Sequence, residues 1–317
     1  MDNAISQSRI VSTASSRLGV ETTTHTQGVS EWVPTSDGRR LYSMVLPGPA
    51  QGATDRPTVV FEAGSGASRS SWAKVQKEVA GFARAIVYDR SGLGRSEPDP
   101  TGRTLDRMAT DLCGLLDHFA PGPFVLVGHS AGGPIIRLAA SRKPDSVVGL
   151  VLVDPADEAA DVLFSKKFRC IEWTAIRIGW VLAKLGLLWR LHRSLLDAVP
   201  ALDVRDDLLH EGFTPRVMAT VAQQARTFLD ELETWKITPP KLADIPLTII
   251  SGGLANKDDG MPEKVRAQAI ASHVYRAAQC RQGRHVTAEK SGHLVPVTEP
   301  DLIVAEIERT VKGSDSR

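Results

Sequence analysis

The chain has 317 residues, of which 42% are hydrophobic and 24% are charged, a composition typical of a globular protein with a large core. Its formal net charge of +1 provides no overall field for nucleic acid or for an anionic membrane, so we expect neither as a partner. The three cysteines, Cys113, Cys170 and Cys280, form no C-x-x-C pair, which argues against a disulfide framework or a metal site and suits a reducing cytoplasm.

Two stretches bear on targeting. Residues 1–28 are rich in Ser and Thr and hold no apolar core long enough for a signal peptide, so we expect an N-terminal arm. Residues 171–191 are the most apolar stretch, but Glu172, Arg177, Lys184 and Arg190 are too many charges for a membrane span. We expect a cytoplasmic protein, either a monomer or a homodimer.

The elements predicted along the chain alternate between short apolar strands and helices. Strands are predicted at residues 29–34, 41–46, 58–61, 83–88, 124–127, 147–153, 247–251 and about 286–290, and helices at 71–82, 105–119, from about 131 onward and 301–311. Near-continuous apolar strands that alternate with helices are typical of a mostly parallel sheet covered on both faces.

One long interval, residues 156–240, contains no strand signal and holds most of the tryptophans of the chain. Its apolar residues recur at helical spacing, which predicts a helical cap inserted into a core made of residues 29–155 and 241–317. Most of its aromatic side chains should form the core of the cap. Trp173, Trp180 and Trp189 are candidates to line an apolar substrate pocket.

The most informative motif is Gly128-His129-Ser130-Ala131-Gly132, which follows an apolar strand and precedes a helix-like segment. This G-x-S-x-G pattern is typical of a nucleophile elbow, in which the serine sits on a sharp strand-to-helix turn. The flanking glycines lack a Cβ, so neighbouring backbone can pass close to the strained serine. Ser130 is therefore the predicted nucleophile.

With the elbow, two further motifs make the chain resemble the α/β-hydrolase family over residues from about 29 to 312. Residues 89–96 are similar to the D-x-R-G-x-G-x-S loop of that family, with Ser91 where arginine is frequent, and residues 291–296 are similar to its histidine loop. The resemblance implies an α/β fold with a doubly wound, mostly parallel sheet of about eight strands and a helical cap. It also implies a serine hydrolase that needs no cofactor or metal.

The resemblance assigns the base and leaves the acid open. His293 lies on the Ser-Gly-His loop where the family places the base that activates serine. The family usually carries the acid after the strand at residues 247–251, where the loop is longer than the usual pattern. There Asp258, four residues before Pro262, is preferred over Asp259, and Asp154, at the end of the preceding core strand, is a third candidate.

The same resemblance assigns the oxyanion hole, which needs two donors. One is the backbone N–H of Ala131, and the other is that of Ser65, in the turn after the strand at residues 58–61. The family often has histidine in that turn, and Glu62 is a candidate to replace its hydrogen bonds. Asp89 and Arg90 are interpreted as structural residues that hold a glycine-rich loop beside the site.

Together these residues predict a serine hydrolase that cleaves a small carboxylic ester with an aromatic or alkyl portion, for example a monoalkyl phthalate. A lactonase, an aminopeptidase for small residues and a carbon–carbon hydrolase of the same fold remain open. A non-catalytic receptor that binds its ligand under the cap is the alternative from another class. An aspartate within about 2.6–3.2 Å of the His293 ring would favour the enzyme.

Overall fold

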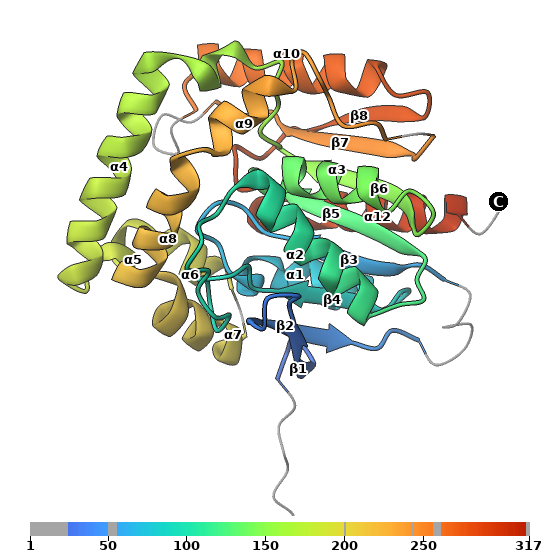
Figure 1. The fold of residues 1–317 in the computed structure, drawn as a ribbon, viewed down its shortest axis with the longest axis horizontal. Helices are drawn as coiled ribbons and strands as arrows, with labels where there is room; N and C mark the ends of the chain where they lie inside the picture. Colours follow the sequence, from blue (N-terminus) through green and yellow to red (C-terminus); the bar gives the residue numbers. More distant parts are fainter. Residues whose placement is uncertain (1–24, 50–55, 200, 243, 256–260, 315–317) are drawn as a thin grey trace, which may run out of the picture.

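The computed structural model describes residues 25–49, 56–199, 201–242, 244–255 and 261–314, which form one eight-stranded sheet with helices around it (Figure 1). The strand order is β1-β2-β4-β3-β5-β6-β7-β8. The strands are β1 (Val29–Pro34), β2 (Arg40–Leu46), β3 (Thr58–Glu62), β4 (Ala85–Tyr88), β5 (Phe124–His129), β6 (Val147–Val153), β7 (Leu247–Gly252) and β8 (Gly283–Ala288).

The sheet is antiparallel at one edge and parallel elsewhere. Strand β2 pairs antiparallel with both β1 and β4, whereas all pairings from β4 through β8 are parallel. Every residue of β3, β4, β5 and β7 is buried, as expected for parallel strands with both faces covered. The α/β-hydrolase fold expected from the sequence is confirmed.

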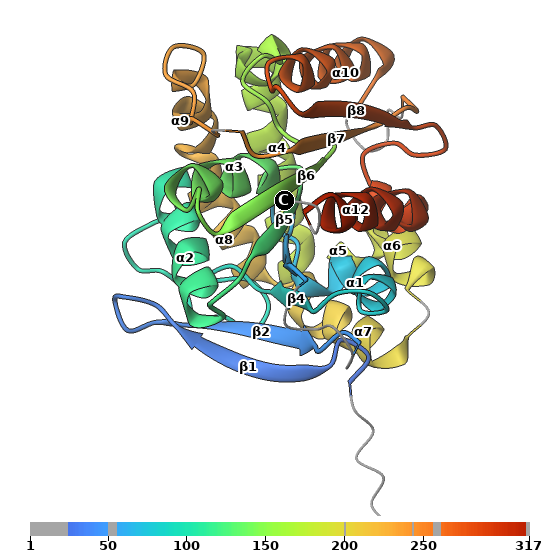
Figure 2. The ribbon, with the colours of Figure 1, turned by 90° about the vertical axis from the view of Figure 1, so that its right-hand side faces the viewer.

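Helices cover both faces of the sheet (Figure 2). One face packs against α1 (Ala73–Val79) and α12 (Pro300–Ser314), and the other against α2 (Leu105–His118), α3 (Gly132–Arg142) and α10 (Glu263–Ala278). Short helices η1 (Arg69–Trp72) and α11 (Val295–Thr298) precede α1 and α12. The two apolar cores between these layers hold the sheet rigidly, so the loops at its strand ends have fixed starting points.

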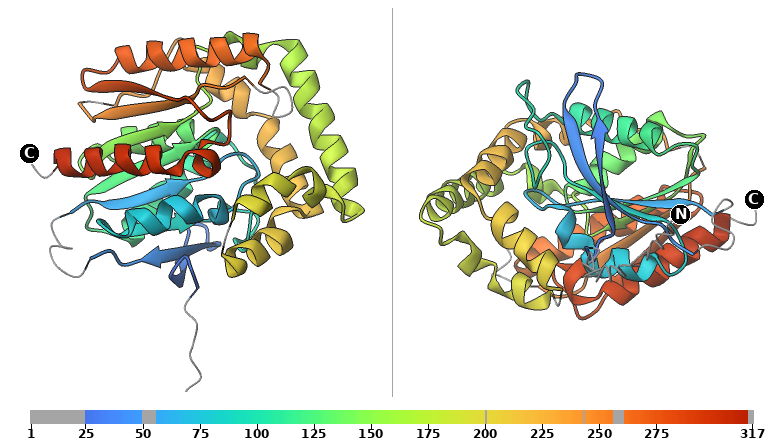
Figure 3. Two further views of the ribbon diagram at one scale, coloured as in Figure 1. Left: turned by 180° about the vertical axis from the view of Figure 1, so that it is seen from behind. Right: turned by 90° about the horizontal axis from the view of Figure 1, so that it is seen from below.

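Between β6 and β7 the described residues are helical and contain no strand. We call residues 156–240 the helical insertion. Its helices are η2 (Asp161–Phe164), α4 (Lys166–Lys184), α5 (Leu188–Leu191), α6 (Arg193–Ala198), α7 (Leu202–Asp207), η3 (Leu208–Gly212), α8 (Pro215–Ala225) and α9 (Phe228–Thr234). Helices α4 to α8 gather at one end of the sheet, with α4 outermost (Figures 1 and 3).

Three elements differ from the prediction. The helix predicted at residues 71–82 is the 3-10 turn η1 followed by the shorter α1. Strand β8 begins at Gly283 rather than near residue 286, because this edge strand is half-exposed and needs no apolar residues at its start. Helix α10 was not predicted, because its buried face carries polar and small residues, among them Arg266, Ser272 and His273.

Candidate active site

The structure places Ser130 on the sharp turn between β5 and α3, with a positive φ of 54°. A Cβ at Gly128 would lie 2.7 Å from the carbonyl oxygen of Gly132. A Cβ at Gly132 would lie 2.6 Å from the carbonyl oxygen of Glu62 on β3. Both glycines are therefore required for the backbone to close around the strained serine.

His293 lies on the loop between β8 and α11 and connects two side chains. Its Nε2 is 3.0 Å from Ser130 Oγ, and its Nδ1 is 2.6 Å from Asp154 Oδ2. The three side chains come from the ends of β5, β6 and β8, which meet at one edge of the sheet. In this arrangement the imidazole can take the serine proton, and the carboxylate holds the imidazole in one orientation.

Asp154 is fixed from two sides. It follows β6 directly, has a positive φ of 41° and is buried. Its second oxygen, Oδ1, accepts a hydrogen bond from Arg266 Nη1 at 2.6 Å and one from the backbone N–H of Gly252 at 3.0 Å. Burial pushes the pKa of Asp154 upward, but the His293 hydrogen bond and the nearby positive charges outweigh it and hold the pKa below its usual value.

This geometry corrects the order of preference for the acid. The partner of His293 Nδ1 is Asp154, the third candidate, rather than Asp258, the preferred one. Asp258 and Asp259 lie outside the described residues. The dipeptide Asp154-Pro155 directly after a buried strand was the available signal, since aspartate tolerates a left-handed backbone. The contribution of Arg266 had no signal, because it comes from the helix that was not predicted.

A second imidazole supports the loop that carries His293. His129, at the end of β5, is buried, and its Nε2 is 2.9 Å from the carbonyl oxygen of His293. The two rings lie 4.8 Å apart between centroids. Burial, reinforced by the neighbouring His293 imidazole, lowers the pKa of His129 to about 3. His129 is therefore neutral near pH 7 and donates its N–H to the His293 backbone.

The turn after β3 lies beside the elbow and is held by a buried ion pair. Glu62 pairs with Arg90 and also accepts a hydrogen bond from Tyr88. The same guanidinium donates to the carbonyl oxygens of Ala63 and, at 2.6 Å, of Gly64. The structural role predicted for Arg90 is confirmed, and Glu62 is not an ordinary strand-end carboxylate.

Two backbone N–H groups in this region are available to a ligand. Among the residues that the structure describes, the N–H groups of Ser65 and Ala131 donate to no recorded acceptor. Ala131 precedes the first turn of α3, and the Gly64 backbone approaches Ser130 closely enough that a Cβ on Gly64 would lie 3.4 Å from the Ser130 Cβ. Neither N–H group is thus engaged by another part of the described chain.

Helix α8 of the insertion packs over this turn. A Cβ at Gly66 would lie 2.8 Å from Cγ2 of Val221, and Thr220 Oγ1 donates to the Gly92 carbonyl oxygen at 3.1 Å. Arg216 donates to three carbonyl oxygens of the loop at residues 92–96. The sequence did not predict Val221 near the site. Thr214-Pro215, an N-cap followed by proline, was a local signal for the start of this helix.

The three tryptophans proposed to line a substrate pocket all belong to the helical insertion. Trp180 is half-exposed with the Lys184 ammonium 3.9 Å from its ring centroid, and Trp189 packs against the small cluster around Leu196. Trp173 is partly buried on α4. In the described parts of the chain, none of the recorded contacts of these residues reaches the serine, histidine and aspartate, so substrate contact by them stays a prediction.

The insertion is also joined to the core by buried ion pairs. Arg69, on η1, is buried and pairs with Asp89 of the core at 2.5 Å. It also pairs with Asp207 at 2.5 Å and with Glu211 at 2.6 Å, both from the insertion. Arg95 reaches the same two insertion carboxylates. The structural role predicted for Asp89 is confirmed, because it anchors the arginine that fixes the insertion.

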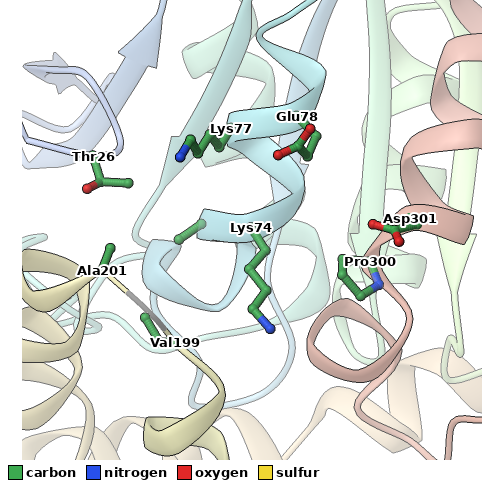
Figure 4. Close-up of a pocket in the computed structure, with 9 residues that line it drawn as sticks. Thr26, Lys74, Lys77, Glu78, Val199, Ala201, Pro300 and Asp301 are labelled. Atoms are coloured by element: carbon green, nitrogen blue, oxygen red, sulfur yellow. The ribbon is translucent and has the colours of Figure 1, made fainter.

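A cavity of about 220 Å³ lies along this junction (Figure 4). Lys74 and Lys77 of α1 face Val199 and Ala201 of the insertion across it. A second cavity, of about 610 Å³, lies between α3, α9 and α10 and is lined by Arg137, Trp235 and Arg276 among others. The linings of both cavities lack the serine, histidine and aspartate described above, so neither cavity opens onto these three side chains.

In the described segments, no group of three or more His, Cys, Asp or Glu side chains is arranged to hold a metal ion. The helices of those segments include none that is both long and apolar enough to cross a membrane.

Comparison with known proteins agrees with the fold. The family model of the alpha/beta hydrolase family matches residues 59–306. The chain is 28% identical to an AB hydrolase superfamily protein of Gibberella zeae over 84% of this chain and 89% of that protein. It is 46% identical to a lipase of Mycobacterium tuberculosis, over only 22% of this chain and 26% of the lipase.

Among solved structures, a thermophilic esterase from Thermogutta terrifontis superposes with a TM-score of 0.65 at 19% identity, over 90% of this chain and 99% of the esterase. At that identity the likeness concerns the fold. The family match covers most of the chain, and the protein belongs to the alpha/beta hydrolase family.

Proposed function

We propose that this protein is a serine hydrolase that cleaves a carboxylic ester through an acyl-enzyme, with Ser130 as nucleophile, His293 as base and Asp154 as the orienting acid. The observation that carries the proposal is the continuous hydrogen-bonded line of 3.0 Å and 2.6 Å through the two ring nitrogens of His293. The second distance falls in the range expected of an enzyme and disfavours a non-catalytic receptor.

The reaction begins when Ser130 Oγ attacks the ester carbonyl carbon while its proton passes to His293 Nε2. The tetrahedral intermediate collapses, and the alcohol leaves with the proton from His293. Water then attacks the acyl-enzyme, with His293 again taking a proton, and the carboxylic acid is released as Ser130 regains its hydrogen. Asp154 stabilises the imidazolium formed in each step and keeps Nδ1–H as its donor.

The backbone N–H groups of Ser65 and Ala131 bind the oxyanion in this proposal. Support comes from their freedom from other recorded acceptors and from the close approach of the Gly64 backbone to Ser130. Arg90 holds the turn through the carbonyl oxygens of Ala63 and Gly64, so the N–H groups are oriented before the substrate arrives. Preorganised donors of this kind stabilise the intermediate more than the ground-state ester.

One apolar side chain supports the proposed substrate class. Val221 of α8 packs over Gly66 and presents an apolar side chain beside the turn that carries the proposed oxyanion donor. An apolar wall favours an ester with an alkyl or aromatic portion. A series of p-nitrophenyl esters of increasing acyl length and a panel of aromatic monoesters would therefore identify the preferred acyl and alcohol groups.

The test is a rapid-mixing burst assay with p-nitrophenyl acetate and butyrate. The wild type should release about one p-nitrophenol per Ser130 before steady turnover, because the activated ester acylates the serine faster than water hydrolyses the acyl-enzyme, which accumulates. Ser130→Ala should lose the burst and the turnover. Ser146→Ala is the matched control, since Ser146 precedes β6 at the opposite end of the sheet from Ser130. A burst that survives in Ser130→Ala, or a folded wild type with neither burst nor turnover, would contradict the proposal.

A further inference from the structure

The outward face of α4 displays large apolar side chains. Four of them are about half exposed or more: Ile171 (56%), Ile178 (54%), Val181 (49%) and Leu185 (65%), the last being the C-cap residue of α4. Their spacing of seven, three and four residues places them in one stripe. The opposite face of the same helix carries the buried residues Ile176, Gly179 and Ala183 and packs on α8. The helix is therefore apolar on two faces, and its neighbours cover only one.

The same segment concentrates positive charge. Helix α4 carries five Lys or Arg side chains and one carboxylate, a net charge of +4, whereas the whole chain carries +1. Arg169 pairs with Asp230 at 3.3 Å and Arg193 with Asp197 at 3.4 Å. In the part of the chain that the structure describes, Lys166, Lys167 and Arg177 have no carboxylate within 4.0 Å, nor have Lys184 and Arg190.

We propose that this face of α4 docks on the surface of an anionic lipid bilayer. An exposed apolar stripe flanked by cations is the pattern of helices that lie in the interface of a membrane. The charged residues along α4 exclude a spanning helix and favour one that lies on the surface.

Charge decides between this partner and a second copy of the chain. Two copies that met through α4 would bring two helices of net charge +4 together, which opposes association. With an anionic bilayer the electrostatic interaction is attractive instead of repulsive. The expectation that the protein has no membrane partner rested on the net charge of the whole chain, which conceals this local excess.

The position of α4 connects docking to the site. Helix α4 is the outermost helix of the insertion and packs on α8, the helix that contacts Gly66 beside the elbow (Figures 1 and 3). Docking would turn the insertion toward the lipid, where esters with an alkyl portion concentrate. This consequence rests on the proposed function, whereas the docking itself does not.

Vesicle co-sedimentation of the full chain tests the proposal. The wild type should sediment with vesicles of an equal mixture of phosphatidylglycerol and phosphatidylcholine, weakly with phosphatidylcholine alone, and less in high salt. Ile178→Ser with Leu185→Ser should lower the partition coefficient about tenfold, and Arg177→Glu with Lys184→Glu at least as much. The matched control is Ile237→Ser, an exposed apolar residue outside α4.

Several outcomes would overturn the proposal. Absence of binding, equal binding to neutral vesicles, or binding unchanged in both double variants would each contradict it, provided that circular dichroism and melting show the variants folded. Sedimentation velocity without lipid tests whether a second copy of the chain occupies this face instead. A dimer that dissociates in the variant Ile178→Ser with Leu185→Ser would assign the face to a second copy. Ser130→Ala should bind vesicles as the wild type does, which separates failure of docking from failure of the proposed chemistry.

Discussion

Charged side chains are buried and paired at the strand ends that carry Asp154 and Glu62, whereas on the outer face of α4 they are exposed to solvent. At the sheet end, Asp154 is buried and bonded to His293 and Arg266, and Glu62 is buried and paired with Arg90. On α4, Lys184 is exposed to solvent beside exposed apolar side chains. Buried ion pairs fix the positions of catalytic atoms, which a chemical reaction requires. Exposed cations and apolar side chains suit a partner that can adapt its shape, such as a lipid surface.

The largest effect is expected where a buried charge loses its partner. Arg90→Met removes the guanidinium from Glu62 and from the turn after β3. We expect the free energy of unfolding to fall by roughly 3–5 kcal/mol, because an uncompensated buried carboxylate remains. Urea denaturation measures the change. Glu62→Leu added to Arg90→Met should recover part of the loss, and a single variant as stable as the wild type would show that the pair is not desolvated.

A second test asks whether the acid needs its buried cation. Arg266→Met should lower kcat about tenfold and change KM little, because Asp154 would lose the bond that holds Oδ1 while the substrate contacts remain. Steady-state kinetics with a p-nitrophenyl ester measures both constants. Arg281→Met, at an exposed arginine, is the control. If the two variants have the same kcat, Arg266 has no part in positioning Asp154.

A third test uses the burial of His129. Its pKa is about 3 in the folded protein and near 6.5 when exposed, so the unfolded chain binds the extra proton as the pH falls below 6.5. The stabilisation is complete above pH 6.5, and we expect a loss of about 1.4 kcal/mol per pH unit from this group at pH values between its two pKa values. Burial also lowers the pKa of His273, which adds a loss of the same sign.

Urea denaturation at several pH values between 6.5 and 4.5 measures this slope. His129→Gln should flatten it without abolishing it, because His273 still contributes. A slope that is identical in the variant and the wild type would show that His129 is not the neutral buried group described above.

The smallest effect is expected on the outer face of α4. Ile178→Ala should change the free energy of unfolding by less than about 0.5 kcal/mol, as at most exposed positions. Ile176→Ala, on the buried face of the same helix, should cost about 2–5 kcal/mol. Equal losses in the two variants would indicate that another part of the molecule covers the outer face in solution.

Local patterns explain how much of the molecule could be predicted. The buried strands, Ser130 and His293 were each encoded in a few consecutive residues, so the fold and these two positions followed from the sequence. The acid depended on which of two strand ends reaches His293, a choice made by contacts between residues more than a hundred positions apart in the chain. Val221 lies near the site only because α8 folds back over Gly66, which no local pattern encodes.

Whether Asp154 is the acid of the site can be decided by comparing Asp154→Asn with Asp258→Asn in the same ester assay. An asparagine at position 154 keeps the shape but leaves the imidazole in the wrong tautomer, so we predict a fall in kcat of about 10⁴-fold. Asp258→Asn should keep kcat within about threefold of the wild type, since Asp154 already occupies Nδ1 of His293. Loss of activity in Asp258→Asn with activity retained in Asp154→Asn would contradict the account.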